Sequence, residues 1–183
     1  KGQIHGYLVV DFSDFNAFKI QMNTFFANNF IDILINNTQG PSAGSAIEKG
    51  VDDYQTAFDL LFKCAVYTTS LALPYMQKNR WGRIINVSSI SVREPLNYLV
   101  LSNSIRSALV SWGKSLSIDV AKDNITVNTT LTGYFDTDRI AQLNSKKAEK
   151  MNIPADQVRK EMEAQVPMQR IGVPEEFQNL VCF

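Results

Sequence analysis

The feature that most constrains the fold is a regular alternation of short apolar runs with longer helical periods. Four runs have the length and composition of strands: residues 7–10 (YLVV), 31–35 (IDILI), 82–89 (GRIINVSS) and 125–131 (ITVNTTL). Apolar side chains recur at helical spacing over residues 14–29, 51–79 and 98–122. Because connections this long are crossovers, we expect an α/β fold with a parallel sheet and helices on both faces.

Unusual polar residues lie at the end of each predicted strand or directly after it. They are Asp11, the run Asn36-Asn37-Thr38-Gln39-Gly40, the pair Ser88-Ser89, and Thr132-Gly133. Sheets of this kind bind ligands outside the carboxyl ends of their strands, so these residues are predicted to form one rim.

Composition excludes several classes of function. The chain has 18 basic and 18 acidic side chains, so no net field would attract nucleic acid or anionic lipid. His5 is the only histidine, which argues against a histidine-rich metal site or a histidine-based triad, so no metal is expected. The distant thiols of Cys64 and Cys182 suit a reducing compartment, and no apolar run approaches the ~20 residues that span a bilayer. We therefore expect a cytoplasmic protein.

Residues 134–170 are polar, rich in lysine and too long for a plain connection. We interpret them as a lid or substrate-binding segment; the alternative is a solvated helical pair without a role in binding. The chain begins at the threshold of a strand and stops inside a helix opened by Pro174. We predict one domain over residues 1–183 that is incomplete at both ends.

The quoted segments resemble the short-chain dehydrogenase/reductase family. VVDFSD, DILINN, GRIINVSS, the helix of residues 98–122, ITVNTTLTGYFDTDRI and RIGVPEEF occur in its order and spacing. The resemblance, closest to 3-oxoacyl-[acyl-carrier-protein] reductases, implies a Rossmann-type, doubly wound parallel sheet that binds NAD or NADP. It also implies a small carbonyl or alcohol substrate, and a homodimer or homotetramer built through helices 51–79 and 98–122.

The same resemblance assigns cofactor contacts. Asp11 would bind the adenine amino group, Asn37 would support the adenosine half, and Phe135 and Thr137 would face the nicotinamide carboxamide. Phe12 and Thr38, in the same turns, complete the set. Gln39 and Thr132 depart from the family's turns, where glycine and proline stand. The family's glycine-rich phosphate loop is not found in these residues, so we expect no dinucleotide bound to them alone and place that loop before Lys1.

The family's catalytic residues are only partly present. Ser89 stands at the position of the serine that orients the substrate carbonyl. An ungapped count from Ser89 puts Ser102 at the position of the catalytic tyrosine and Arg106 at that of the lysine. Leu61 stands where an asparagine is expected. Arg106 keeps the positive charge of the lysine and is expected to hold ribose hydroxyls. Ser102 is not an equivalent replacement for the tyrosine, because an alkyl hydroxyl is a far poorer acid than a phenol.

Tyr98 is a possible substitute, four residues before Ser102. On one continuous helix, Tyr98, Ser102 and Arg106 would share a face, although helical side chains lean toward the amino end and would direct the phenol away from Arg106. These three residues and Ser89 are the predicted catalytic set.

Three functions stay open at this stage. The first is an NAD(P)-dependent oxidoreductase with an altered proton donor. The second is a protein on the same scaffold that binds a dinucleotide or metabolite without catalysis. The third is an oligomer subunit whose long helices form a structural interface.

Overall fold

The computed structural model describes residues 5–182. They divide into two compact units, with the boundary between Leu131 and Thr132.

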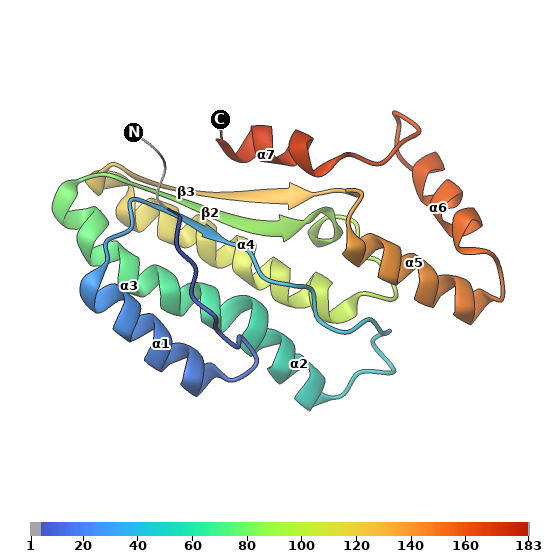
Figure 1. Ribbon diagram of the computed structural model, residues 1–183, viewed down its shortest axis with the longest axis horizontal. Coiled ribbons are helices and arrows are strands. Elements are labelled where there is room, and N and C mark those ends of the chain that lie inside the picture. Colours follow the sequence, from blue (N-terminus) through green and yellow to red (C-terminus); the bar gives the residue numbers. More distant parts are fainter. Residues whose placement is uncertain (1–4, 183) are drawn as a thin grey trace. The chain divides into compact units, whose positions relative to one another are not determined.

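The first unit is built on a three-stranded sheet. Its strands are β1 (Ile33–Asn36), β2 (Gly82–Ser89) and β3 (Ile125–Thr132, whose last residue begins the second unit), in the order β1-β2-β3. β1 and β2 are parallel, with Leu34 opposite Ile84, and the three arrows point the same way in Figure 1. Three of the four predicted strands are thereby confirmed, each within two residues at either end.

The helices of this unit follow the predicted order. They are α1 (Phe15–Asn28), α2 (Val51–Phe58), α3 (Cys64–Asn79) and α4 (Val100–Val120), with short 3-10 turns at Ile90–Val92 and Ala121–Asp123. α1 begins where Asp14 caps it, because that carboxylate accepts hydrogen bonds from the amides of Asn16 and Ala17, each 3.0 Å long.

A single helical path covers residues 51–79, as the sequence predicts. Between α2 and α3 the chain forms one π-helical segment, Asp59–Lys63, so the axis continues while one turn widens. Leu61 lies in this segment and is only 2% exposed. The position expected to carry an asparagine is therefore filled by a core side chain.

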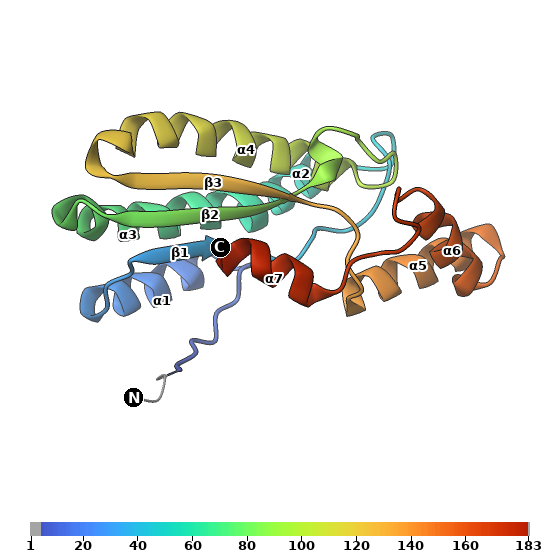
Figure 2. The ribbon, with the colours of Figure 1, turned by 90° about the horizontal axis from the view of Figure 1, so that it is seen from above.

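The apolar core lies between one face of the sheet and its helices. Ala72 and Met76 of α3 and Val120 of α4 pack against Ile84 of β2 and Ile125 of β3. Figures 1 and 2 show α1, α3 and α4 on the same side of the strands. The opposite face carries exposed apolar side chains, with Ile33 55% and Ile35 47% exposed. The second helical layer that the alternation predicts is not among the helices of this unit.

The predicted strand at residues 7–10 is wrong. This segment has no regular secondary structure, and its side chains are exposed, with Tyr7 at 93% and Val9 at 80%. A strand needs a hydrogen-bonded neighbour, and no described strand lies beside this segment. Apolar composition alone was a poor guide because the pairing partner decides the conformation.

The second unit contains three helices, α5 (Asp138–Met151), α6 (Ala155–Ala164) and α7 (Pro174–Cys182). Ala148 of α5 and Val158 and Met162 of α6 are its buried apolar contacts on these helices. A parallel bridge joins Phe135 to Gly172, which ties the start of the unit to the segment before α7. The weak helical periodicity of residues 135–165 thus corresponds to two helices, α5 and α6, which are joined by a tight turn.

No helix in the described part of the chain is both long and apolar enough to cross a bilayer.

Candidate functional site

A largely buried polar network joins the carboxyl end of β1 to the middle of β2. Asn36 of β1 donates through Nδ2 to Asn86 Oδ1 at 2.9 Å and to Thr69 Oγ1 of α3 at 3.1 Å. Asn86 and Thr69 are both fully buried. Asn86 Nδ2 itself has no hydrogen-bond partner among the described residues. Because satisfied side-chain networks in a low-dielectric interior are rigid, this network holds the end of β1 against the middle of β2 and against α3.

A glycine makes room for this network. A Cβ atom added to Gly113 of α4 would lie 2.9 Å from Asn86 Nδ2 and 3.3 Å from Thr129 Oγ1. α4 therefore approaches the sheet closely at this point. This arrangement was not predicted from the sequence, although an asparagine inside the apolar run GRIINVSS is a signal of a buried polar contact.

Ser89 is the last residue of β2 and is half-buried. Its Oγ accepts a hydrogen bond of 3.2 Å from the amide of Ser91, and this bond caps the start of the 3-10 turn Ile90–Val92. The turn packs against α4. Ser89 is thus placed at a strand end, as predicted, and its hydroxyl is oriented by its own backbone turn.

Arg106 is the buried cation of this region. It is 8% exposed, and its Nη1 donates to the carbonyl oxygen of Val87 at 2.7 Å, two residues before Ser89. Burial lowers the pKa of its guanidinium. An arginine nonetheless stays charged in a protein, so the positive charge is retained beside the end of β2.

Ser102 lies one helical turn before Arg106 and is also buried, at 9% exposure. Residues four apart on a helix share a face, so α4 presents Ser102 and Arg106 together toward β2. Ser89 and these two α4 residues therefore belong to one region, where α4 packs on β2 and on the turn after it.

Tyr98 does not share that face, which corrects the prediction of one helix from residue 98. α4 begins at Val100, and Leu99, with φ −124° and ψ 36°, is its non-helical cap. The backbone of this entry segment pairs elsewhere: the carbonyl of Tyr98 accepts from the amide of Gly44 at 2.7 Å, and Leu99 forms a parallel bridge with Gly44. The missed signal is the turn-forming stretch Glu94-Pro95-Leu96-Asn97, which delays the helix.

The turn at Asp11 lies close to the loop that follows β1. Asp11 Oδ1 accepts from Ser13 Oγ at 2.6 Å and from the Ser13 amide at 2.8 Å, and these bonds lower the pKa of its carboxyl group. Ser13 lines a hollow of about 450 Å³ together with Gln39 and Gly40, and with residues of α2 and α4. The segment holding Asp11 and the loop after Asn37 and Thr38 therefore border one depression, even though Asp11 does not follow a strand.

Phe12 is placed by packing. Its ring lies 5.0 Å from the ring of Phe18, and the thiol of Cys64 is 3.8 Å from its carbonyl oxygen. Asn37 is exposed and Thr38 is half-buried in the loop after β1.

Phe135 and Thr137 lie in the second unit, where each has a local contact. Phe135 packs against Gly172, where an added Cβ would approach its ring to 2.7 Å, and its ring centroid is 5.5 Å from that of Phe177. Thr137 caps α5, because its Oγ1 accepts from the Ile140 amide at 3.4 Å.

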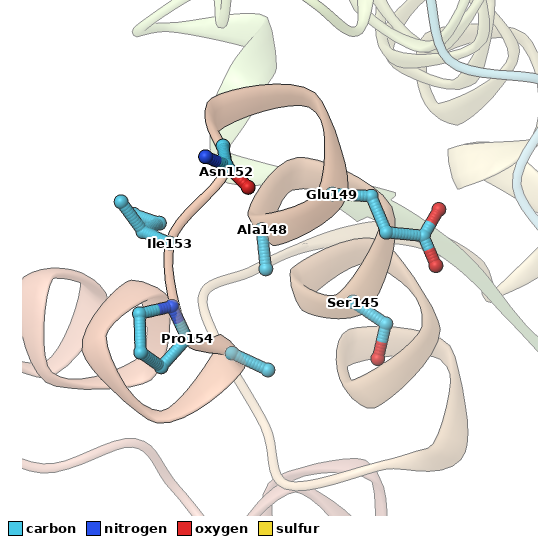
Figure 3. A pocket seen from close by; sticks show the side chains of 7 residues that line it. Ser145, Ala148, Glu149, Asn152, Ile153 and Pro154 are labelled. Atoms are coloured by element: carbon cyan, nitrogen blue, oxygen red, sulfur yellow. The ribbon is translucent and has the colours of Figure 1, made fainter.

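A shallow pocket of about 500 Å³ in the second unit surrounds the turn between α5 and α6 (Figure 3). Its lining consists of Ser145, Ala148, Glu149, Asn152, Ile153, Pro154 and Ala155. None of the predicted site residues lies there. Among residues 5–182, no three histidine, cysteine or acidic side chains are grouped to hold a metal ion.

The parallel sheet, its helices and the polar strand ends define the chain as a Rossmann-type α/β protein. The family profile described as Enoyl-(Acyl carrier protein) reductase matches residues 5–183. The chain belongs to the short-chain dehydrogenase/reductase family, with sequence relatives that include 3-oxoacyl-[acyl-carrier-protein] reductases.

Among curated relatives, the NADPH-dependent reductase BacG of Bacillus subtilis is 29% identical over 153 residues, which are 84% of this chain and 59% of BacG. The 3-oxoacyl-[acyl-carrier-protein] reductase FabG of Rickettsia felis is 32% identical over 157 residues, 84% of this chain and 59% of that protein. The chain thus spans less than two thirds of the length of these relatives.

Two solved structures share the fold. YwfH, an NADPH-dependent reductase involved in bacilysin biosynthesis, superposes with a TM-score of 0.87 at 26% identity, over 96% of this chain and 68% of YwfH. A short-chain dehydrogenase family protein from Francisella tularensis has the same TM-score at 23% identity, over 96% of this chain and 72% of its own.

Proposed function

We propose that the protein is an NAD(P)-dependent oxidoreductase that transfers hydride between a nicotinamide cofactor and a carbonyl or alcohol substrate. The observation that carries this proposal is the joint placement of Ser89 and the buried cation Arg106 at the end of β2, in a chain of this family. Relatives described as NADPH-dependent or 3-oxoacyl reductases support the reaction type.

The cofactor would be held from several turns. The ionised carboxylate of Asp11 is an acceptor suited to the adenine amino group, and the hollow beside Ser13, Gln39 and Gly40 has mainly apolar walls with a few polar side chains, as small-molecule sites do. We assign Phe12, Asn37 and Thr38 to the same half of the cofactor. Phe135 and Thr137 are proposed for the carboxamide. When bound, the nicotinamide supplies or accepts the hydride.

Within the substrate site, Ser89 would orient the carbonyl oxygen by donating its hydroxyl hydrogen. Its backbone turn leaves that hydrogen available, because Ser89 Oγ acts as the acceptor toward Ser91. Arg106 supplies a fixed positive charge next to this position. Proton delivery is the altered step, because Ser102 replaces a phenol and Tyr98 lies outside α4.

The test is cofactor oxidation by the full-length protein with ketones, aldehydes and 3-oxoacyl thioesters. Turnover is expected with at least one class, at a rate roughly 10²- to 10⁴-fold below that of a family enzyme with a phenolic acid. Bound cofactor without turnover on any of them would contradict the proposal.

A second function is favoured by the buried Leu61 and by Ser102. On this view the protein binds a dinucleotide or metabolite and catalyses nothing. The triple variant Leu61→Asn, Ser102→Tyr, Arg106→Lys, checked for folding by circular dichroism, would then gain an activity that the natural protein lacks. Equal activity before and after the substitutions would exclude this alternative.

A further inference from the structure

Arg106 is a buried charge that has no counterion among residues 5–182. Among residues 5–182 no carboxylate lies within ion-pair distance of its guanidinium, and its one direct partner is the neutral carbonyl of Val87. Other arginines of the chain are paired: Arg159 with Asp136 at 2.9 Å and Arg170 with Glu176 at 2.6 Å. Those pairs are exposed, where an arginine needs a partner least.

Burying an unpaired cation is costly, and the cost is removed when an anion is bound. The hydroxyls of a ribose are neutral and would not compensate the charge. A carboxylate would, and the planar guanidinium has five donors in a geometry that matches two carboxylate oxygens. One of these donors is committed to Val87, which also fixes the direction of the fork.

Two serine hydroxyls belong to the region where α4 packs on the turn after β2. Ser102 is one helical turn before Arg106 on the same face of α4. Ser91 lies in the 3-10 turn, is fully buried, and has an Oγ with no hydrogen-bond partner among the described residues. Both hydroxyls are donors of the kind that a bound anion uses.

We propose that Arg106, with Ser102, binds a carboxylate group of the substrate, so that the protein acts on 2-oxo acids or their hydroxy equivalents rather than on neutral ketones. This inference rests on the proposed function, because it places the carboxylate next to the carbonyl that Ser89 orients. It assigns to Arg106 a role in substrate recognition that differs from holding ribose.

The first test is binding alone, by calorimetry on the full-length protein, with benzoylformate and its neutral counterpart benzoylformamide. The carboxylate is expected to bind roughly 30-fold or more tightly than the amide, as for a buried charge pair. Equal affinities would overturn the inference, and this comparison needs no variant and no turnover.

Variants then locate the effect. Arg106→Met should remove the preference for the carboxylate, Arg106→Lys should keep part of it, and Ser102→Ala should weaken carboxylate binding about threefold to tenfold. If Arg106→Met does not fold, Arg106→Lys and Ser102→Ala still carry the test. A preference that survives in all three variants would place the anion elsewhere and overturn the assignment.

Four further outcomes separate this inference from its rivals. If Arg106→Lys binds NADPH more weakly and keeps the full preference for the carboxylate, Arg106 holds the ribose of the cofactor and not the substrate. In steady-state kinetics, loss of a ground-state charge pair raises KM, whereas a fall in kcat alone would mean that Arg106 acts on charge formed in the reaction. If the protein turns over neutral ketones only, the inference is overturned and the proposed function stands. If it turns over no carbonyl compound, the proposed function is overturned, and the binding comparison still tests the carboxylate site.

Discussion

At the scale of single residues, the proposed function depends on three polar side chains, Ser89, Ser102 and Arg106, whose catalytic roles are predictions from the family resemblance. Ser89 stands at the end of β2, while Ser102 and Arg106 share the buried face of α4 behind it. The sequence predicted these locations because a strand end and a shared helical face follow from residue spacing. It did not predict that Arg106 is bound to the Val87 carbonyl without a protein carboxylate, because such a contact depends on how α4 packs against β2.

A substitution at Gly113 tests the close approach of α4 to the sheet. In Gly113→Ala the new methyl group meets Asn86 and Thr129, and such overpacking costs about 1–3 kcal/mol. This exceeds the ~1 kcal/mol by which alanine is favoured over glycine in a helix. Urea unfolding should show a lower midpoint. Gly6→Ala is the control, since nothing lies within 4 Å of the added Cβ; equal stability of both variants would disprove the close contact.

The two cysteines should differ in reactivity. Burial, the first cause, together with nearby Asp59, raises the pKa of the Cys64 thiol to about 11, so almost no thiolate exists at pH 8. Cys182 is exposed. Iodoacetamide at pH 8 should therefore modify Cys182 in the folded protein and both residues in urea, as read by mass spectrometry. Comparable labelling of Cys64 in the folded state would contradict its burial.

At the scale of helices and strands, periodicity predicted the elements whose conformation depends on local sequence. It failed for segments whose conformation depends on a neighbouring strand or turn. The helix of residues 51–79 and the strand Gly82–Ser89 were predicted with their observed ends. The segment at residues 7–10 was predicted as a strand because its composition is apolar, but no described strand pairs with it. Tyr98 was placed on α4 because its spacing suited the helix, although the helix begins two residues later.

The start of α7 is held by a pair that depends on pH. The carboxylate of Glu176 accepts hydrogen bonds from both Nη groups of Arg170, at 2.9 and 2.6 Å, and from the amide of Val173. These bonds lower the pKa of the Glu176 carboxyl group to about 2, and those from Arg170 have the largest effect. A depressed carboxyl pKa contributes stability that is present above the ordinary value of 4.5 and is lost as pH falls toward 2.

An NMR titration of the Glu176 side chain should therefore show a midpoint well below pH 4.5, and Arg170→Gln should return it toward that value. Lys160, which pairs with Asp156 instead, gives a matched control in Lys160→Gln, which should leave Glu176 unchanged. A midpoint near 4.5 in the unaltered protein would show that the pair does not form in solution.

At the scale of the whole molecule, the family resemblance implies an oligomer, which we propose forms through the two long helices. Phe62 of the π segment and Trp112 of α4 touch edge to face, with centroids 6.0 Å apart, so these helices lie side by side. Ile118 of α4 is 70% exposed, and an apolar side chain of that size gains from burial at an interface.

Sedimentation of the full-length protein should show a dimer or tetramer. Ile118→Lys should weaken the association at least about tenfold, because it places a charge in an apolar contact. Ile20→Lys, at a site 67% exposed on α1, is the matched control and should leave the assembly intact. A monomeric natural protein, or equal effects of the two substitutions, would exclude an interface on these helices.

The central claim is that the strand ends of this chain, together with the turn at Asp11, form part of a nicotinamide nucleotide site. Titration of the full-length protein with NADH and NADPH, followed by the change in cofactor fluorescence, measures it directly. We predict saturable binding of at least one of the two, weakened about tenfold by Asp11→Ala, which removes the proposed contact to adenine. Absence of binding to both cofactors would contradict the account.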